Sequence, residues 1–313
     1  MDESNMPLAS VIIPTYNGEA FIREAVGSAL AQTYPNIEIM VVDDGSTDGT
    51  RKQLEDFIKD GRIKYVFQQN AGPGVARNTG IRNTSGELIA LLDHDDLWMP
   101  EKIEKQVRYM LENPRVDIVF CNGCCFDDKR KDELRPVHDV SEKFEGLDFF
   151  EMFDKGLQTL PTAVVFKRRA IELTGDFING IDGGEDWDMW FRMAAKGLKF
   201  AYVVDMLFKR RLHSANMTNS LTATKAEYYR LSYGIFEPLI KNLSKKDSTH
   251  VKKRLALNIF ISARKAMGGG NFKDGVHYGL KAAGFQYKYY FKLPGLIVRY
   301  LRFMLRRKFG INQ

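Results

Sequence analysis

The sequence contains little cysteine and no long apolar run. Of its 313 residues only three are cysteines, and these cluster at Cys121, Cys124 and Cys125. A small, odd and clustered set argues against a disulfide framework and is typical of proteins from the reducing cytosol. The C-x2-C-C spacing also lacks the second pair of ligands that a structural zinc site requires. We therefore expect neither disulfides nor zinc.

Signals that direct a chain into or across a membrane are not evident either. The first residues, MDESNMPLAS, are polar and acidic, unlike the apolar core of a secretory signal peptide. No uncharged apolar run approaches the roughly 18 residues that a transmembrane helix needs. A cytoplasmic protein is the expectation.

Acidic residues are missing from residues 288–313. This tail carries seven lysines and arginines and no Asp or Glu, so the net charge of +6 resides in it. The nearly neutral remainder argues against a nucleic-acid partner. Within the tail, Arg299, Arg302 and Arg306 share one face of a predicted helix whose other face is largely apolar. Such a helix either packs on its own domain or lies in an anionic membrane surface. We favour the membrane, because packing alone does not require the absence of acids.

Strand and helix signals alternate through the first half of the chain. Short apolar runs that predict strands occur at 10–14, 37–43, 63–67, 87–93 and 116–122, and helical patterns lie between them near 19–32, 48–59, 73–84 and 100–112. This alternation predicts an α/β fold whose parallel sheet is covered on both faces. A second block predicts a helix at 145–155, a strand at 162–167, a helix from Glu185 and a strand at 199–204. From about residue 222 only helical patterns remain.

Polar motifs follow three of the predicted strands: PTYNG (14–18), DDGSTDGT (43–50) and DHDD (93–96). In open α/β sheets, ligands bind beyond the carboxyl ends of the strands. A dinucleotide-binding domain would carry G-x-G-x-x-G after its first strand. The nearest match, GPGVAR (72–77), follows the third strand and lacks the last glycine. NAD binding is therefore not predicted.

A nucleotide held by a pocket and a metal fits these motifs better. Tyr16 offers a ring that can stack on a base, and Asp43 or Asp44 can accept hydrogen bonds from a base or ribose. Asp93 and Asp95 supply carboxylates of the kind that hold Mg²⁺ or Mn²⁺ together with phosphate oxygens. We predict that these aspartates bind a divalent metal carrying a nucleotide diphosphate.

Four segments, in this order, resemble the motifs of family 2 glycosyltransferases. They are SVIIPTYNGEAFIREAVGSALAQTYPNIEIMVVDDGSTDGT, NAGPGVARNTGI, GELIALLDHDDLWMPEKI and GGEDWDMWFRMAAKG, and the resemblance covers about residues 8–215. It implies the GT-A fold, a Rossmann-like and mostly parallel nucleotide-binding sheet flanked by helices. It also implies transfer of a hexose or related sugar, with inversion, from a nucleotide diphosphate donor such as a UDP-sugar.

The resemblance also bears on the acceptor, although it ends before residues 222–313. It implies a saccharide or lipid-linked saccharide acceptor in cell-surface polysaccharide synthesis, for which peripheral attachment to the inner face of the cytoplasmic membrane would be useful. We expect one glycosyltransferase domain at 1–221, with a nucleotide-binding half at 8–122 and an acceptor-binding half at 123–221. A helical, basic C-terminal extension is expected at 222–313.

Residues that match the family's motifs take roles from the resemblance. Asp44 resembles the acid that binds uracil, with Tyr16 and Pro14 lining the base. Asp93 resembles the first acid of the D-x-D motif, near the ribose and sugar of the donor. Asp95 resembles the second acid, which holds the metal.

The later motifs contribute the chemistry. Asp186 resembles the catalytic base. Arg211 and His213 resemble an Arg-x-His element that can close over the diphosphate, with Arg211 on the donor and His213 at the metal. Beside the base, Trp187 and Glu185 are expected to contact the acceptor.

Arg77 is the remaining predicted donor contact. It lies one turn into a helix that GPG opens, and helix N-termini favour anions.

Simpler explanations exist for several of these residues. Asp186 lies in the first turn of a predicted helix, where the helix dipole favours any acid. Asp44 to Thr50 has the composition of a turn and helix cap, although we expect Asp43 and Asp44 to do more than that. Trp187 has a core position as the alternative to an acceptor contact, and Trp190 is expected in the core. The alternative for Arg77 is an exposed position on the helix, surrounded by solvent and without contact to the donor.

Two other classes of protein remain open at this stage. A sugar nucleotidyltransferase also binds a nucleotide with metal-binding acids, but it would carry a glycine-rich basic loop where this chain has PTYNGEAF. A non-catalytic nucleotide- or carbohydrate-binding module would not need Asp95 and Asp186 together.

Overall fold

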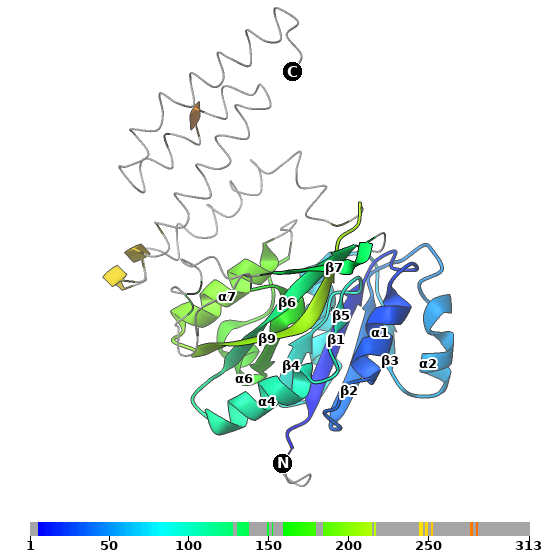
Figure 1. Cartoon of the computed structure of the whole chain (residues 1–313), viewed down its shortest axis with the longest axis horizontal. Coiled ribbons are helices and arrows are strands. Elements are labelled where there is room, and N and C mark those ends of the chain that lie inside the picture. Colours follow the sequence, from blue (N-terminus) through cyan, green and yellow to red (C-terminus); the bar gives the residue numbers. More distant parts are fainter. Residues whose placement is uncertain are drawn as a thin grey trace, which may run out of the picture. The chain divides into compact units, whose positions relative to one another are not determined.

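The described part of the chain is built around one sheet of nine strands. The computed structural model describes residues 6–127, 130–137, 159–179 and 184–214, with isolated positions outside these ranges. Strands pair in the order β3-β2-β1-β4-β8-β6-β9-β5, and β7 pairs with β6 (Figure 1).

The first half of the sheet is entirely parallel. It contains β1 (Ala9–Thr15), β2 (Ile37–Asp43), β3 (Lys64–Phe67) and β4 (Leu88–Leu91). Every residue of β1 and β4 is buried, as expected for strands covered on both faces. All four strands end at the same edge, so the loops after them can form one site.

The second half of the sheet is mixed. It contains β8 (Val164–Lys167), β6 (Ile118–Asp127), β9 (Phe200–Arg211), β5 (Leu97–Trp98) and β7 (Arg130–Pro136). β8 runs antiparallel to both β4 and β6, whereas β9 runs parallel to β6 and carries two register irregularities. The strand direction therefore changes between β4 and β8, directly beside the DHDD loop.

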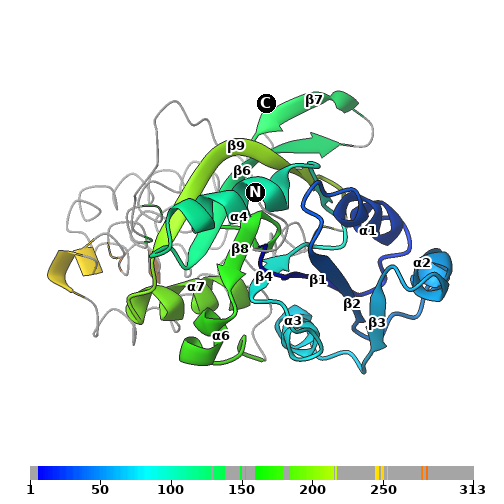
Figure 2. The same ribbon diagram turned by 90° about the horizontal axis from the view of Figure 1, so that it is seen from below.

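Helices cover both faces of the sheet. They are α1 (Ile22–Leu30), α2 (Glu55–Lys59), α3 (Pro73–Arg82), α4 (Lys102–Glu112), α6 (Arg169–Thr174) and α7 (Glu185–Ala195), with short 3₁₀ turns at Lys52–Leu54 and Pro161–Ala163. Figure 2 shows α1 and α4 on one face of the sheet and α3, α6 and α7 on the other.

Trp190 lies at the centre of the packing between α7 and the sheet. It is fully buried and makes edge-to-face contacts with Phe120, Phe166 and Phe177. Its indole N–H donates to the backbone oxygen of Thr159 at 2.9 Å, so the buried polar group is satisfied. The expectation that Trp190 belongs to the core agrees with this environment.

The observed α/β fold confirms the predicted class, with several differences in the elements. β5, β7 and α6 were not predicted, and β9 continues to Arg211 instead of ending near residue 204. β5 has only two residues, too few for a periodic signal, and β9 is extended by its long pairing with β6. The expected helix at 48–59 is reduced to a 3₁₀ turn and the short α2.

The chain divides into two compact units. One comprises Met1–Phe149 with Leu157–Ser214, and the other Phe150–Gly156 with Ala215–Gln313. The expected domain boundary at 221, and most of the expected helix at 145–155 and of the extension at 222–313, lie outside the described residues. Among the residues that are described, no helix is long and apolar enough to cross a membrane.

Candidate functional site

The loop after β2 is anchored by Asp44. Its backbone N–H donates to the backbone oxygen of Thr15 at 2.8 Å, which joins the ends of β1 and β2. Its carboxylate accepts from Gln68 Nε2 at 2.7 Å and from the backbone N–H groups of Ala71 and Gly72 at 3.0 and 2.8 Å. Because a carboxylate has about four acceptor positions, roughly one remains for a ligand.

Asp43 holds the turn that follows it, so the turn explanation applies to it in part, and its contact with a nucleotide stays a prediction. Oδ1 accepts from the backbone N–H of Ser46 at 2.8 Å, and Oδ2 accepts from the Tyr65 hydroxyl at 2.6 Å. The residue is only 1% exposed. Asp44 is similarly buried, at 3% exposed, and by the same count of acceptor positions both carboxylates keep some capacity for a ligand, so both stay predicted nucleotide contacts.

Tyr16 lies on the loop after β1 and is 49% exposed, whereas Pro14 within β1 is buried. The loop is fixed to the one after β2. Asn17 accepts from the Thr47 backbone N–H at 2.9 Å, and the Gly18 backbone N–H donates to Thr50 Oγ1 at 2.8 Å. An exposed ring on a rigid loop is suited to stacking on a planar ligand.

The DHDD loop after β4 brings three carboxylates together. Thr162 Oγ1 accepts from the backbone N–H of Asp93 at 3.0 Å, and the Asp96 backbone N–H donates to the Asp93 carbonyl at 3.1 Å. Burial and the charges of Asp95 and Asp93 raise the pKa of Asp96 well above its usual value. Asp96 Oδ1 accepts from the backbone N–H of Arg211 at 3.0 Å. Asp96 therefore links this loop to the end of β9.

The side chains of Asp95 and His213 are in direct contact. His213 Nε2 lies 3.0 Å from Asp95 Oδ2, and the two side chains are 19% and 16% exposed for Asp95 and His213, respectively. The imidazole also packs on Phe21 with 4.5 Å between ring centroids. The described residues contain no cluster of three or more metal-binding side chains. This pair provides one carboxylate and one imidazole, which suits a divalent ion whose other ligands come from a phosphate group.

Arg211 is buried beneath the DHDD loop and only 3% exposed. Its Nε donates to the backbone oxygen of Asp95 at 3.0 Å, and Nη2 pairs with Glu24 at 2.6 Å. Its guanidinium carbon lies 4.9 Å from the centroid of the Phe21 ring and 4.7 Å from that of Phe126. Arg211, predicted as a donor contact, thus stabilises the DHDD loop in this structure through its bond to the Asp95 carbonyl.

Arg77 is equally enclosed, and the solvated alternative for it is wrong. The side chain is 4% exposed and joins two carboxylates, with Nη2 at 3.0 Å from Asp93 Oδ1 and Nη1 at 2.6 Å from Glu185 Oε1. Burial alone would lower the pKa of Arg77, but the two carboxylates outweigh it and raise the pKa. Burial also raises the pKa of Asp93, against the opposing charge of Arg77.

The first turn of α7 carries the predicted base and its neighbours. Gly184 opens the helix at φ 114°, a conformation that favours glycine, and Glu185 follows it into the interior. Burial, followed by the charge of Glu185, raises the pKa of Asp186 to about 7, while Arg77 opposes the shift. Trp187 is half-buried and lies beside Phe191, at 6.5 Å between centroids.

The structure therefore brings most of the predicted residues to one edge of the sheet. Three contributors were not predicted: Thr162, which supports Asp93, and Glu24 and Phe21, which hold Arg211 and His213. Glu24 and Phe21 lie one turn apart at the start of α1, but nothing in their spacing marks them as partners of residues near 211. Only the three-dimensional contact reveals them.

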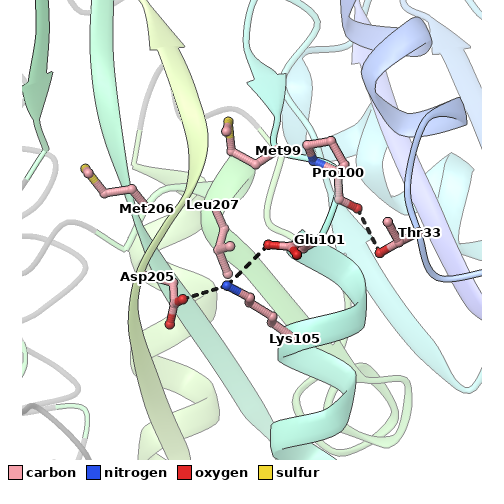
Figure 3. Close-up of a pocket in the computed structure, with 8 residues that line it drawn as sticks. All are labelled: Thr33, Met99, Pro100, Glu101, Lys105, Asp205, Met206 and Leu207. Carbon is pink, nitrogen blue, oxygen red and sulfur yellow. Dashed lines mark hydrogen bonds and ion pairs between the residues drawn. The ribbon is translucent and has the colours of Figure 1, made fainter. Parts of the chain in front are cut away.

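A groove of about 490 Å³ lies elsewhere on the molecule, lined by Thr33, Met99, Pro100, Glu101, Lys105, Asp205, Met206 and Leu207 (Figure 3). None of the predicted site residues lines it. Lys105 spans it by pairing with Asp205 at 2.7 Å and Glu101 at 3.3 Å. This groove is separate from the loops that carry the candidate site.

Comparison with known proteins identifies the class to which this fold and site belong. The model of glycosyl transferase family 2 matches residues 10–174. An uncharacterized glycosyltransferase of Rickettsia typhi is 36% identical over 254 residues, which cover 78% of this chain and 77% of that protein. The chain belongs to glycosyl transferase family 2, and it is a glycosyltransferase.

Solved structures share the fold at low sequence identity. S. aureus TarS 1-349 in complex with UDP-GlcNAc aligns with a TM-score of 0.61 at 15% identity, covering 89% of this chain and 92% of that one. Mannosyltransferase PcManGT from Pyrobaculum calidifontis, in complex with GDP-Man and Mn²⁺, aligns with a TM-score of 0.60 at 20% identity, covering 99% and 90%. These likenesses confirm the expected GT-A-like fold.

Proposed function

We propose that this glycosyltransferase moves a sugar, with inversion, from a UDP-sugar to a hydroxyl group of a saccharide or lipid-linked saccharide. The environment of Asp186 carries the proposal. It is a half-buried carboxylate at the start of α7, close enough to Asp93 and Arg77 for their charges to act on it, with a pKa raised to about 7. A group with this pKa can take a proton from an attacking hydroxyl at neutral pH.

The donor would occupy the edge formed by the loops after β1, β2 and β4. The exposed ring of Tyr16 is available to stack on the base, with Pro14 beneath, and Asp44 retains one acceptor position for a base N–H. Asp93, 31% exposed and oriented by Arg77, is placed to accept from the ribose or sugar. The TarS and PcManGT structures contain UDP-GlcNAc and GDP-Man, which supports a nucleotide-sugar donor here.

Asp95 and His213 fit a divalent cation, Mn²⁺ or Mg²⁺. They present an oxygen and a nitrogen that face each other 3.0 Å apart and are both partly accessible, and PcManGT contains Mn²⁺. When bound, the ion would neutralise charge on the leaving diphosphate. The chain's own contribution is to hold Asp95, through the bond from Arg211 to its carbonyl, and to keep His213 against Phe21.

The reaction follows from one base acting in a single displacement. Asp186 removes the proton of the acceptor hydroxyl, whose oxygen attacks the anomeric carbon as the bond to the diphosphate breaks. Attack opposite the leaving group inverts the configuration. General-base assistance contributes about 10²–10⁴-fold, and positioning of donor and acceptor supplies much of the rest. Trp187, half-buried beside Asp186, is the proposed platform for a sugar acceptor.

A panel of nucleotide sugars tests the proposal. Release of the nucleoside diphosphate from UDP- and GDP-sugars would be followed with Mn²⁺, with Mg²⁺ and with EDTA. We expect turnover of a UDP-sugar that requires the metal. Release of pyrophosphate from a nucleoside triphosphate and sugar phosphate would instead indicate a nucleotidyltransferase, and binding without turnover would indicate a non-catalytic module.

Attachment to an anionic membrane surface is part of the proposal, with the inner face of the cytoplasmic membrane as the location. It rests on the basic and apolar pattern of 288–313, which lies outside the described residues.

A further inference from the structure

Two of the predicted ligand contacts, Arg77 and Glu185, are bound to each other instead of facing an open pocket. Nη1 of Arg77 donates to Oε1 of Glu185 at 2.6 Å, and their side chains are 4% and 8% exposed. The second oxygen, Glu185 Oε2, is buried with no hydrogen-bond partner within the described residues. A donor diphosphate or an acceptor sugar would have to displace this buried pair to reach either group.

The same guanidinium also binds Asp93, with 3.0 Å between Nη2 and Oδ1. One rigid planar group therefore connects the loop after β4 with the first residue of α7, which are 92 positions apart in sequence. Arginine suits this task because its donors are fixed in one plane and point in different directions.

The segment that leads toward α7 is locked to α3 on the same side. Asn78 Nδ2 donates to the backbone oxygen of Phe177 at 2.8 Å, and the Phe177 backbone N–H donates back to Asn78 Oδ1 at 2.9 Å. A Cβ on Gly74 would come within 2.9 Å of the Ile178 backbone oxygen and 3.4 Å of Glu185 Cγ, so a glycine is required for this approach. α3 thus holds both the segment and the start of α7.

We propose that the Asp93–Arg77–Glu185 bridge is a positioning element that fixes the first turn of α7, and with it Asp186, relative to Asp93. Arg77 and Glu185 then act through their neighbours instead of touching donor or acceptor. This inference rests on the proposed function, because it assigns Asp186 as the base and Asp93 to the donor. It replaces the ligand contacts that the sequence predicted for the two residues.

Because the bridge residues are charged, replacing them should change the pH dependence of the rate. A purely structural role would leave that pH dependence unchanged. Among the described residues, the charged groups that act on Asp186 are Glu185 on α7, Arg77 on α3 and Asp93 after β4. Glu185 raises the pKa of Asp186 and Arg77 lowers it. Asp186 must be deprotonated to act as the base, so the rate falls at pH values below its pKa. Glu185→Gln should move this acid limb of the rate profile to lower pH, and Arg77→Gln should move it to higher pH.

The matched control is an ion pair at the surface that joins α3 to the segment leading toward α7. Arg82 on α3 pairs with Asp176 at 2.7 Å, and both side chains are more than half exposed, at 55% and 54%. Arg82→Gln and Asp176→Asn remove the same charges as the test variants and should leave the profile and the rate unchanged. A loss of activity that also occurs in these controls would reflect general loosening of α3.

The experiment follows UDP release from the UDP-sugar that the panel selects, with Mn²⁺ and with water as the acceptor, over a range of pH. We expect Arg77→Gln to lower kcat about 10- to 100-fold through misplacement of the base, whereas Glu185→Gln, whose amide can still accept from Arg77, should shift the acid limb with a smaller loss of kcat. The affinity for UDP, measured by calorimetry, should change by less than about threefold. If Arg77→Gln does not fold, Glu185→Gln still tests the inference, because the amide keeps an oxygen for Arg77.

Two results would overturn the inference. One is a loss of UDP affinity of about tenfold or more with kcat preserved, which would make the residues ligand contacts. The other is an acid limb that stays in place in both variants. The Asp186→Asn protein separates this from failure of the proposed function. Retained activity in Asp186→Asn would show that Asp186 is not the base. If Asp186→Asn is inactive but the acid limbs of the two bridge variants stay in place, only the positioning role is overturned.

Discussion

His213 Nε2 lies 3.0 Å from Asp95 Oδ2, although 118 positions separate the two residues in the chain. The contact forms because β9 runs to Arg211 and delivers the following residues to the loop after β4. Arg211 secures the approach by donating to the Asp95 carbonyl at 3.0 Å. A carboxylate and an imidazole from distant parts of the chain are thus in direct contact.

Asp95→Ala and His213→Ala are each expected to abolish the enhancement of UDP binding by Mn²⁺. Calorimetry of UDP binding with Mn²⁺ and with EDTA measures this enhancement directly. Asp205→Ala, on the separate groove, is the control for loss of an aspartate and should retain the enhancement. If Mn²⁺ enhances UDP binding to Asp95→Ala as strongly as to the wild type, Asp95 does not bind the metal.

Asp186→Asn is expected to abolish sugar transfer and leave UDP affinity nearly intact. The amide preserves size but cannot accept the proton, so only the basic function is lost, at a cost of about 10²-fold or more. The measurement is UDP release under saturating donor, paired with calorimetry. Asp188→Asn serves as the comparison, since Asp188 pairs with Arg192 at 2.7 Å; it is, with Glu185, the next candidate if Asp186 is not the base. Transfer within about tenfold of wild type would place the base elsewhere.

Arg211→Gln is expected to destabilise the protein by about 3 kcal/mol, because it removes a buried cation that several groups depend on. The matched control is Arg23→Gln. Arg23 also pairs with a carboxylate and stacks on a phenylalanine, but it is 48% exposed, so the midpoint of urea denaturation should hardly move. Equal effects of the two substitutions would contradict the structural role of Arg211.

Lys102 makes the stability depend on pH in the alkaline range. It is fully buried, with Nζ at 2.7 Å from Gln106 Oε1 and 4.2 Å from the centre of the Trp98 ring, and burial lowers its pKa from 10.5 to about 8. Between these values the unfolded chain holds the proton and the folded protein does not. The contribution of Lys102 to stability therefore rises with pH across this window.

Urea denaturation of wild type and Lys102→Met at several pH values tests this linkage. Relative to the variant, the wild type should gain about 3 kcal/mol between pH 7 and pH 10.5, as expected for this shift. Lys59→Met, at a lysine whose side chain is 76% exposed, is the control and should not change the slope. Parallel curves for wild type and Lys102→Met would show that Lys102 keeps its usual pKa.

The basic tail is expected to bind anionic vesicles. The full-length chain should sediment with phosphatidylglycerol vesicles at low salt and be released at high salt, since each basic residue near the headgroups contributes about 1 kcal/mol. Changing Arg299, Arg302 and Arg306 to Gln should greatly reduce binding, and so should ending the chain at Lys292. Neutralising Lys59, Arg62 and Lys64 instead controls for total charge. Equal sedimentation of the full-length and shortened proteins would contradict the prediction.

Local sequence patterns predicted the parallel half of the sheet well, because each of its strands is a short apolar run bounded by polar turns. β2 has the predicted limits of 37–43, β1 is one residue longer at each end than predicted, and β3 begins one residue later than predicted. The mixed half was harder. The two residues of β5 carry no period of their own, and β9 is extended through pairing with β6, which depends on residues some eighty positions away.

The sequence by itself determined the family and the position of the acidic motifs at strand ends, because those depend on residue order and on short-range periodicity. What each charged side chain does was decided by the tertiary structure. Arg77 and Arg211 both read as ligand contacts in the sequence, yet both are buried, one between Asp93 and Glu185 and the other between Phe21 and Phe126. Burial and partner choice come from contacts between distant segments, and these set whether a charge faces a substrate or supports the residues that do.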